Sequence, residues 1–152
     1  MSQQKILIAL PLDEDLLTPL HSWGQNFDWN SVSEVHLSHV VKKNITPLEF
    51  GLVEMPDVET FKNMKPTLQK FLDDESRKIL SSGFKGKIIT HLTSDFDPEE
   101  EVIRYLHENR ADLVVVSTKG KHGFAGLFHS SFTEHMIRFA PCNVLVIRPQ
   151  TK

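Results

Sequence analysis

Residues 112–126 read Asp-Leu-Val-Val-Val-Ser-Thr-Lys-Gly-Lys-His-Gly-Phe-Ala-Gly. The apolar residues 113–116 follow one another without a polar interruption, a pattern typical of a strand that is covered on both faces of a sheet. The segment after them holds three of the chain's seven glycines. A doubly buried strand that runs directly into a glycine-rich loop predicts an α/β fold with a parallel sheet.

The rest of the chain alternates between strand and helix patterns. Apolar runs predict four further strands, at residues 5–10, 34–41, 87–92 and 144–147. Apolar residues at helical spacing predict four helices between the strands, at residues 13–27, 58–80, 97–106 and 131–140. This alternation favours β-α-β units. The predicted fold class is therefore α/β, a single-domain, Rossmann-like sheet of five parallel strands with helices on both faces.

Proline and glycine modify three of these helices. Pro19 and Gly24 predict that the first helix is short or kinked. Pro66 predicts a kink or a split in the second helix, and Gly83 is placed to end it. The third helix opens on the aspartate-proline pair at 97–98, which suits an N-cap followed by a first-turn proline.

Residues 42–56 show no clear period and contain Pro47, Gly51 and Pro56. We interpret this segment as a long loop. Loops of this length are often functional, because binding residues concentrate in segments that a rigid scaffold positions.

Length, charge and cysteine content limit the function classes. The 152 residues fit one domain, 1–152, and the formal net charge of -3 gives no basic excess for nucleic acid. Apolar runs are far shorter than the roughly 18 residues of a membrane span. The single Cys142 cannot form an intramolecular disulfide, which favours a reducing compartment. We therefore expect a cytoplasmic protein with no membrane and no nucleic-acid partner.

The glycine-rich loop has the parts of an anion site. Glycines let backbone N–H groups approach an oxyanion, Lys119 and Lys121 supply charge, and a helix begins just beyond at Ser130 or Ser131. The alternative is that the glycines only shape a turn and that the lysines are solvated. Neither GxxxxGK[ST] nor GxGxxG after the first strand occurs, which argues against a P-loop NTPase and a classical dinucleotide dehydrogenase.

Four segments of the chain resemble the universal stress protein family. Residues 112–116, 120–123, 131–134 and 140–148 look like the family's C-terminal half, which often reads DLIVMGxxGxxG, GSVxExV and APCPVLVVR. The opening residues 5–9 resemble the family as well. The resemblance spans essentially the whole chain.

The resemblance implies a five-stranded universal stress protein-like sandwich that is usually dimeric. It also implies two possibilities for the ligand, because some members of the family bind ATP and others do not. The ATP-binding pattern GxxGx9G[ST] falls on Ser117, Gly120, Ser130 and Ser131, and Pro11 stands where an aspartate is expected. A serine in place of glycine adds a Cβ where close backbone approach is needed, although its hydroxyl can donate to a phosphate.

A nucleotide site is the first hypothesis for this chain, with ATP and Mg²⁺ as the implied cofactors. Asp13 offers a substitute carboxylate one turn after Pro11. The candidate nucleotide-binding residues are Pro11, Asp13, Val41, Ser117, Lys119, Gly120, Lys121, Gly123, Ser130 and Ser131. This hypothesis describes a stress-response regulator that hydrolyses ATP slowly at most, because the sequence reveals no catalytic residue and no general base.

The alternative hypothesis is a dimeric interaction module of the same family that does not bind ATP. Its dimer would form through the last strand, with an interface of Val144, Leu145, Val146 and Ile147. The protein partner is not identified by the sequence. No metal site is expected either, because His36 and His39 are three residues apart on a strand and so face opposite sides.

Overall fold

The computed structural model describes residues 3–119 and 131–149, with the side chain of Ser131 left out. A parallel sheet has the strand order β5-β2-β1-β6-β7, and a separate two-stranded antiparallel ribbon has the order β3-β4. The strands are β1 (Gln4–Ala9), β2 (Val32–Lys42), β3 (Asn44–Leu48), β4 (Gly51–Met55), β5 (Lys87–Asp95), β6 (Leu113–Ser117) and β7 (Asn143–Ile147). The helices are α1 (Glu14–Asn26), η1 (Trp29–Ser31), α2 (Val58–Ile79), α3 (Pro98–Asn109) and α5 (Ser131–Phe139). The predicted α/β class is confirmed.

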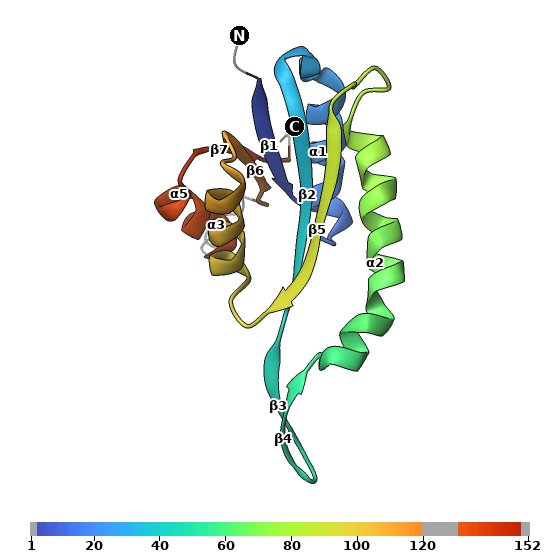
Figure 1. Ribbon diagram of the computed structural model, residues 1–152, viewed down its shortest axis with the longest axis vertical. Helices are drawn as coiled ribbons and strands as arrows, with labels where there is room; N and C mark the ends of the chain where they lie inside the picture. Colours follow the sequence, from blue (N-terminus) through green and yellow to red (C-terminus); the bar gives the residue numbers. More distant parts are fainter. Residues whose placement is uncertain (1–2, 120–130, 150–152) are drawn as a thin grey trace.

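Helices cover both faces of the sheet (Figure 1). In the central strand β1, Ile6, Leu7 and Ile8 are at most 1% exposed. Ile6 and Ile8 belong to the core that packs under α1 and α2, whereas Leu7 belongs to the core under α3 and α5. The alternation follows from the two-residue period of a strand, and the continuous apolar run follows from cover on both sides.

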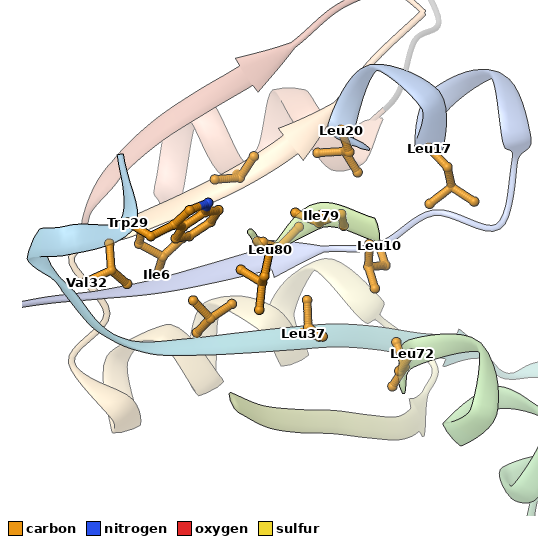
Figure 2. Close-up of a cluster of buried hydrophobic side chains, with 13 residues drawn as sticks. Ile6, Leu10, Leu17, Leu20, Trp29, Val32, Leu37, Leu72, Ile79 and Leu80 are labelled. Carbon is orange, nitrogen blue, oxygen red and sulfur yellow. The ribbon is translucent and has the colours of Figure 1, made fainter. Parts of the chain in front are cut away.

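The larger core joins α1 and α2 to one face of the sheet (Figure 2). Leu20 from α1 and Leu72 and Ile79 from α2 are fully buried there. Trp29, in the short turn η1, closes one end of this core and donates its indole N–H to the carbonyl of Gly24 at 2.8 Å. That bond satisfies the polar end of an otherwise apolar side chain.

Aspartates begin three of the helices. Asp13, Asp57 and Asp97 accept hydrogen bonds from backbone N–H groups in the first turns of α1, α2 and α3. Such caps satisfy amide donors that have no partner inside the helix. The predicted start of α3 at the pair 97–98 is confirmed.

The predicted split of the second helix was wrong, and so was its predicted end at Gly83. α1 runs through Pro19 and Gly24 for 13 residues, and α2 runs through Pro66 for 22 residues and ends at Ile79, before Gly83. Pro66 is exposed, so water can bind the carbonyl that the missing N–H leaves unpaired. No helix in the described ranges is long and apolar enough to cross a membrane.

The predicted loop at 42–56 is instead a hairpin. β3 pairs antiparallel with β4, and Glu49 and Phe50 form the turn between the paired residues Leu48 and Gly51. Gly51 has a φ of 131°, which a glycine adopts without strain. The ribbon extends beyond the main sheet (Figure 1), and its strands show no simple alternation of apolar and polar residues because neither face is fully covered. Because neither face is fully covered, the sequence of these two strands carries no alternating pattern from which they could be predicted.

We expect Gly24→Ala to destabilise the protein by about 2 to 3 kcal/mol. A Cβ at Gly24 would overlap the backbone carbonyl of Ile79, where α1 crosses α2. Urea unfolding measures the change. Gly83→Ala is the matched control, because a Cβ there meets nothing within 4 Å. Equal stability of the two variants would contradict the close helix contact.

Candidate functional site

A cavity lies where the strand order of the sheet reverses. The chain passes from β1 to β2 on one side and from β6 to β7 on the other, so the switch point falls between the neighbouring strands β1 and β6. In open parallel sheets ligands bind at this point, outside the carboxyl ends of the strands. The cavity has a volume of about 240 Å³.

The cavity has apolar walls with a few polar groups. Its lining residues come from the ends of β1, β2 and β6 and from α1, α3 and α5. They are Ala9, Leu10, Pro11, Leu16, Ser38, His39, Val40, Pro98, Val102, Val116, Ser117, Phe132 and Thr133. An apolar enclosure with a small number of polar side chains is typical of a small-molecule site.

Ser117 supplies a hydroxyl that has no partner. This residue ends β6, and its buried Oγ makes no hydrogen bond within the described part of the chain. The carbonyl of Ser117 accepts a hydrogen bond from Thr133 Oγ1 at 3.4 Å, so the backbone is tied to α5 while the hydroxyl is left over. A buried polar group without a partner costs free energy. The Ser117 hydroxyl is therefore placed to form a hydrogen bond with a ligand.

The end of β1 is held to β2 beside the cavity. Leu10 N–H donates to the carbonyl of Ser38 at 2.8 Å, and His39 Nδ1 lies 2.9 Å from the carbonyl oxygen of Leu10. Because a carbonyl only accepts, Nδ1 carries the proton and donates. Pro11 follows in the lining and has no N–H to offer. This wall therefore presents apolar surface where the family pattern expects a carboxylate.

Asp13 and Lys119 link the loops that follow β1 and β6. Asp13 Oδ2 lies 3.0 Å from Lys119 Nζ, and Asp13 Oδ1 accepts from the N–H of Asp15 at 2.9 Å. The pKa of Asp13 is lowered, mainly by the hydrogen bond from Lys119 and to a smaller extent by the bond from the N–H of Asp15. The hydrogen bond to Asp13 in turn raises the pKa of Lys119. Both side chains are exposed and neither lines the cavity. Asp13 is thus already bonded as a helix cap and an ion pair.

The remaining predicted positions are only partly placed. Val41 does not line the cavity, although its neighbour Val40 does, and Ser131 is the first residue of α5. Four predicted residues lie outside the described ranges: Gly120, Lys121, Gly123 and Ser130.

The sequence analysis missed the side chains that α3, α5 and β2 bring to the cavity. The main ones are Ser38, His39, Val102, Phe132 and Thr133. Ser38 carried no distinct signal, because its strand also contains other polar residues, among them Glu34, His36 and His39.

Neither a metal cluster nor an activated thiol is evident in the part of the chain that the structure describes. In the ranges that the structure describes, no three His, Cys, Asp or Glu side chains are grouped to hold a metal ion. Cys142 is half-buried beside the core under α3 and α5, and burial, together with the carboxylate of Asp112, raises the pKa of its thiol to about 11. The thiol is therefore protonated at neutral pH and is a poor nucleophile.

The comparison with known families agrees with this geometry. A family model described as universal stress protein family matches residues 4–148. The chain belongs to the universal stress protein family. Among curated relatives, it is 32% identical to the universal stress protein E homolog of Haemophilus influenzae over 90 residues, which are 59% of this chain and 25% of that protein. The matched part thus spans a quarter of the relative's length.

Solved structures show the same fold. A universal stress protein in complex with cAMP superposes with a TM-score of 0.66 at 15% identity, over 99% of this chain and 100% of that one. A universal stress protein from Archaeoglobus fulgidus in complex with dAMP superposes with a TM-score of 0.59 at 17% identity, over 97% and 99% of the two chains. At these identities the likeness concerns the fold.

We expect Ser117→Ala to leave the ligand-free protein as stable as the wild type, or more stable by about 1 kcal/mol, because the variant removes a buried hydroxyl that lacks a partner. Urea unfolding measures the difference. Ser22→Ala, on the exposed face of α1, is the control. A clear loss of stability in Ser117→Ala alone would mean that the hydroxyl is satisfied in the folded protein.

Proposed function

We propose that this universal stress protein is a cytoplasmic stress-response protein that binds an adenine nucleotide at the switch-point cavity. The observation that carries the proposal is the buried hydroxyl of Ser117, which has no partner among the described residues and lies on an apolar cavity at the carboxyl ends of β1 and β6. The solved complexes of two relatives with cAMP and dAMP support the choice of an adenine nucleotide.

The size of the cavity indicates which part of a nucleotide would lie inside it. Pockets for whole small ligands measure about 300 to 1,000 Å³, whereas this cavity measures about 240 Å³. It therefore suits the base and the ribose, with the phosphates outside it on the side of the loop after β6. Lys119 lies in that loop and is exposed, so it can leave Asp13 and pair with a phosphate.

The proposed role is binding rather than turnover. Phosphoryl transfer needs groups that position the attacking water and neutralise charge on the transferred phosphoryl group. Asp13, whose carboxylate pairs with Lys119 of this loop, is held by that pair and by the first turn of α1. ATP would bring its own Mg²⁺, held mainly by the phosphates. Hydrolysis, if ATP is the ligand, would be slow.

A dimeric module without nucleotide is the second candidate function. Pro11 provides neither a carboxylate nor an N–H to the cavity, and Ser117 places a Cβ where the ATP-binding pattern has glycine. Both features disfavour a nucleotide that is bound in the usual family manner, and they support a function carried by protein surfaces.

The edge strand β7 supports the proposal of a homodimer for either candidate. Within the described ranges β7 pairs with β6 alone, and Val144, Leu145, Val146 and Ile147 are all partly exposed. Val144 and Val146 pack against one core, and Leu145 and Ile147 pack against the other. Pairing with β7 of a second copy would satisfy the free backbone edge and cover these side chains.

Nucleotide binding is tested on freshly purified protein. We expect mass detection to identify an adenine nucleotide released on denaturation, and calorimetry of the stripped protein to give micromolar affinity for AMP or Mg-ATP. Ser117→Ala should bind about tenfold more weakly, a loss of about 1.4 kcal/mol, in keeping with one lost hydrogen bond. Ser22→Ala should bind like the wild type. Empty protein that gives no heat with either nucleotide would favour the second candidate.

The dimer is tested by sedimentation and hydrogen exchange. We expect a dimer at micromolar concentration, with slow exchange of the β7 amides that becomes faster on dilution. β5 is the internal comparison, because it is the other edge strand of the sheet. A monomer at these concentrations, or concentration-dependent protection on β5 in place of β7, would contradict the proposed interface.

A further inference from the structure

Three polar side chains form a relay beneath α3. Ser38 on β2 and His91 on β5 are direct neighbours in the strand register, and Ser38 Oγ lies 2.9 Å from His91 Nδ1. The other ring nitrogen, Nε2, lies 3.0 Å from Oε2 of Glu101 on α3. Ser38 is 1% exposed, and the side chains of His91 and Glu101 are 10% exposed. The relay thus lies between the sheet and the helix.

Other charged and titratable groups surround the relay and fix its geometry. Arg104 on α3 pairs with both carboxylate oxygens of Glu101. Tyr105, also on α3, stacks on the His91 ring with centroids 3.8 Å apart. On β2, His36 lies 2.6 Å from both the Tyr105 hydroxyl and Glu34. His91 therefore has little freedom to turn over when its charge changes.

The direction of each hydrogen bond follows from the partners. An ionised carboxylate only accepts, so in neutral His91 the proton is on Nε2 and points to Glu101. Nδ1 then has only a lone pair, and it accepts the hydroxyl proton of Ser38. When His91 is protonated, Nδ1 also carries a proton and donates to Ser38 Oγ. The Ser38 hydroxyl proton must then turn to another acceptor.

Ser38 connects this change to the cavity. It lines the cavity together with His39 and Val40 from the same strand, and α3 adds Pro98 and Val102 to the opposite wall. With neutral His91, Ser38 Oγ offers a lone pair on the cavity side, which suits a ligand N–H donor. With protonated His91, it offers its O–H, which suits an acceptor. The relay can thus reverse the hydrogen-bonding character of one cavity wall.

We propose that the Ser38–His91–Glu101 relay makes ligand binding in the cavity pH-dependent, with a base that donates an amino N–H bound more tightly when His91 is neutral. This inference rests on the proposed function, because it concerns the same cavity. Ser38 acts by presenting a donor or an acceptor, and His91 and Glu101 act through it as positioning residues. The ligand class is an aminopurine nucleoside or nucleotide.

The direction of the pKa shift of His91 indicates the pH range in which this side chain changes its charge. Burial lowers this pKa below 6.5 and outweighs the hydrogen bond to Glu101, while Arg104 and His36 lower it further. The Glu101 carboxylate stays ionised in this range, because burial, which raises its pKa, is outweighed by Arg104 and His91. A folded-state pKa below the unfolded value means that folding favours neutral His91. Its stabilising contribution is therefore present above pH 6.5 and is lost as the pH falls through the folded-state pKa.

Adenosine is the probe for the test, because it has no phosphate group to titrate. NMR of the imidazole rings gives the His91 tautomer and its pKa, and calorimetry gives the adenosine affinity from pH 4.5 to 8. We expect the Nε2–H tautomer of His91 at pH 7.5. The adenosine affinity should fall at least about fivefold as the pH is lowered, with a midpoint at the His91 pKa. Inosine, which has an acceptor in place of the amino group, should show the opposite change, with an affinity that rises as His91 becomes protonated.

Two variants remove the pH dependence in different ways. His91→Gln lacks a titrating ring and Ser38→Ala lacks the hydroxyl, so adenosine affinity should no longer change with pH in either. Ser38→Ala keeps the inference testable if His91→Gln fails to fold. His107→Gln, on the exposed surface of α3, is the matched control and should keep the wild-type profile.

The outcomes separate the two proposals. Adenosine affinity that is constant with pH, or that follows the titration of His39, overturns the relay and leaves nucleotide binding intact. Loss of the pH dependence in His107→Gln also overturns the relay. Absence of adenosine binding at every pH, with no adenine nucleotide in the purified protein, overturns the proposed function and with it this inference.

Discussion

Burial of β1 on both faces is the constraint on which the other elements depend. Ile6 and Ile8 need cover from α1 and α2, and Leu7 needs cover from α3 and α5, so the helices must lie in two layers. The chain then passes from β1 to β2 on one side of the sheet and from β6 to β7 on the other. The gap at the carboxyl ends, where the cavity lies, follows from that divergence.

The two layers differ in chemistry, and that difference bears on function. The α1 and α2 layer is mainly an apolar core finished by the Trp29 indole, and its one buried carboxylate in the described part of the chain, Glu75 on α2, pairs with His21 on α1. The α3 layer replaces part of that core with hydrogen-bonded polar side chains around His36 and His91. Buried polar networks of this kind add specificity of arrangement when every member is satisfied. The network that reaches the cavity wall, through Ser38, thus belongs to the α3 layer.

Strands that are covered on both sides could be predicted from the sequence, because cover leaves a continuous apolar run such as 113–116. The ribbon at 44–55 could not, because its exposed faces impose no pattern. α2 was predicted with a break at Pro66, since local propensity omits the packing of Leu72 and Ile79 that holds the helix together.

The candidate site was predictable only near the switch point. Ser117 and Pro11 could be found because each directly follows or ends a predicted strand. Ser38 and Val102 could not, since the register of β2 and the rotation of α3 decide that they face the cavity. Those two quantities depend on tertiary packing rather than on local sequence.

The ribbon formed by β3 and β4 has a consequence for the way this chain can vary. Among the described strands, β3 and β4 pair with each other alone, and a two-stranded ribbon has little stability of its own in water. The ribbon can therefore open locally, without unfolding of the five-stranded sheet, and this opening exposes its turn at Glu49 and Phe50 to proteases. The same independence allows the ribbon to be shortened to a tight connection, or extended with new residues, without a change in the rest of the fold.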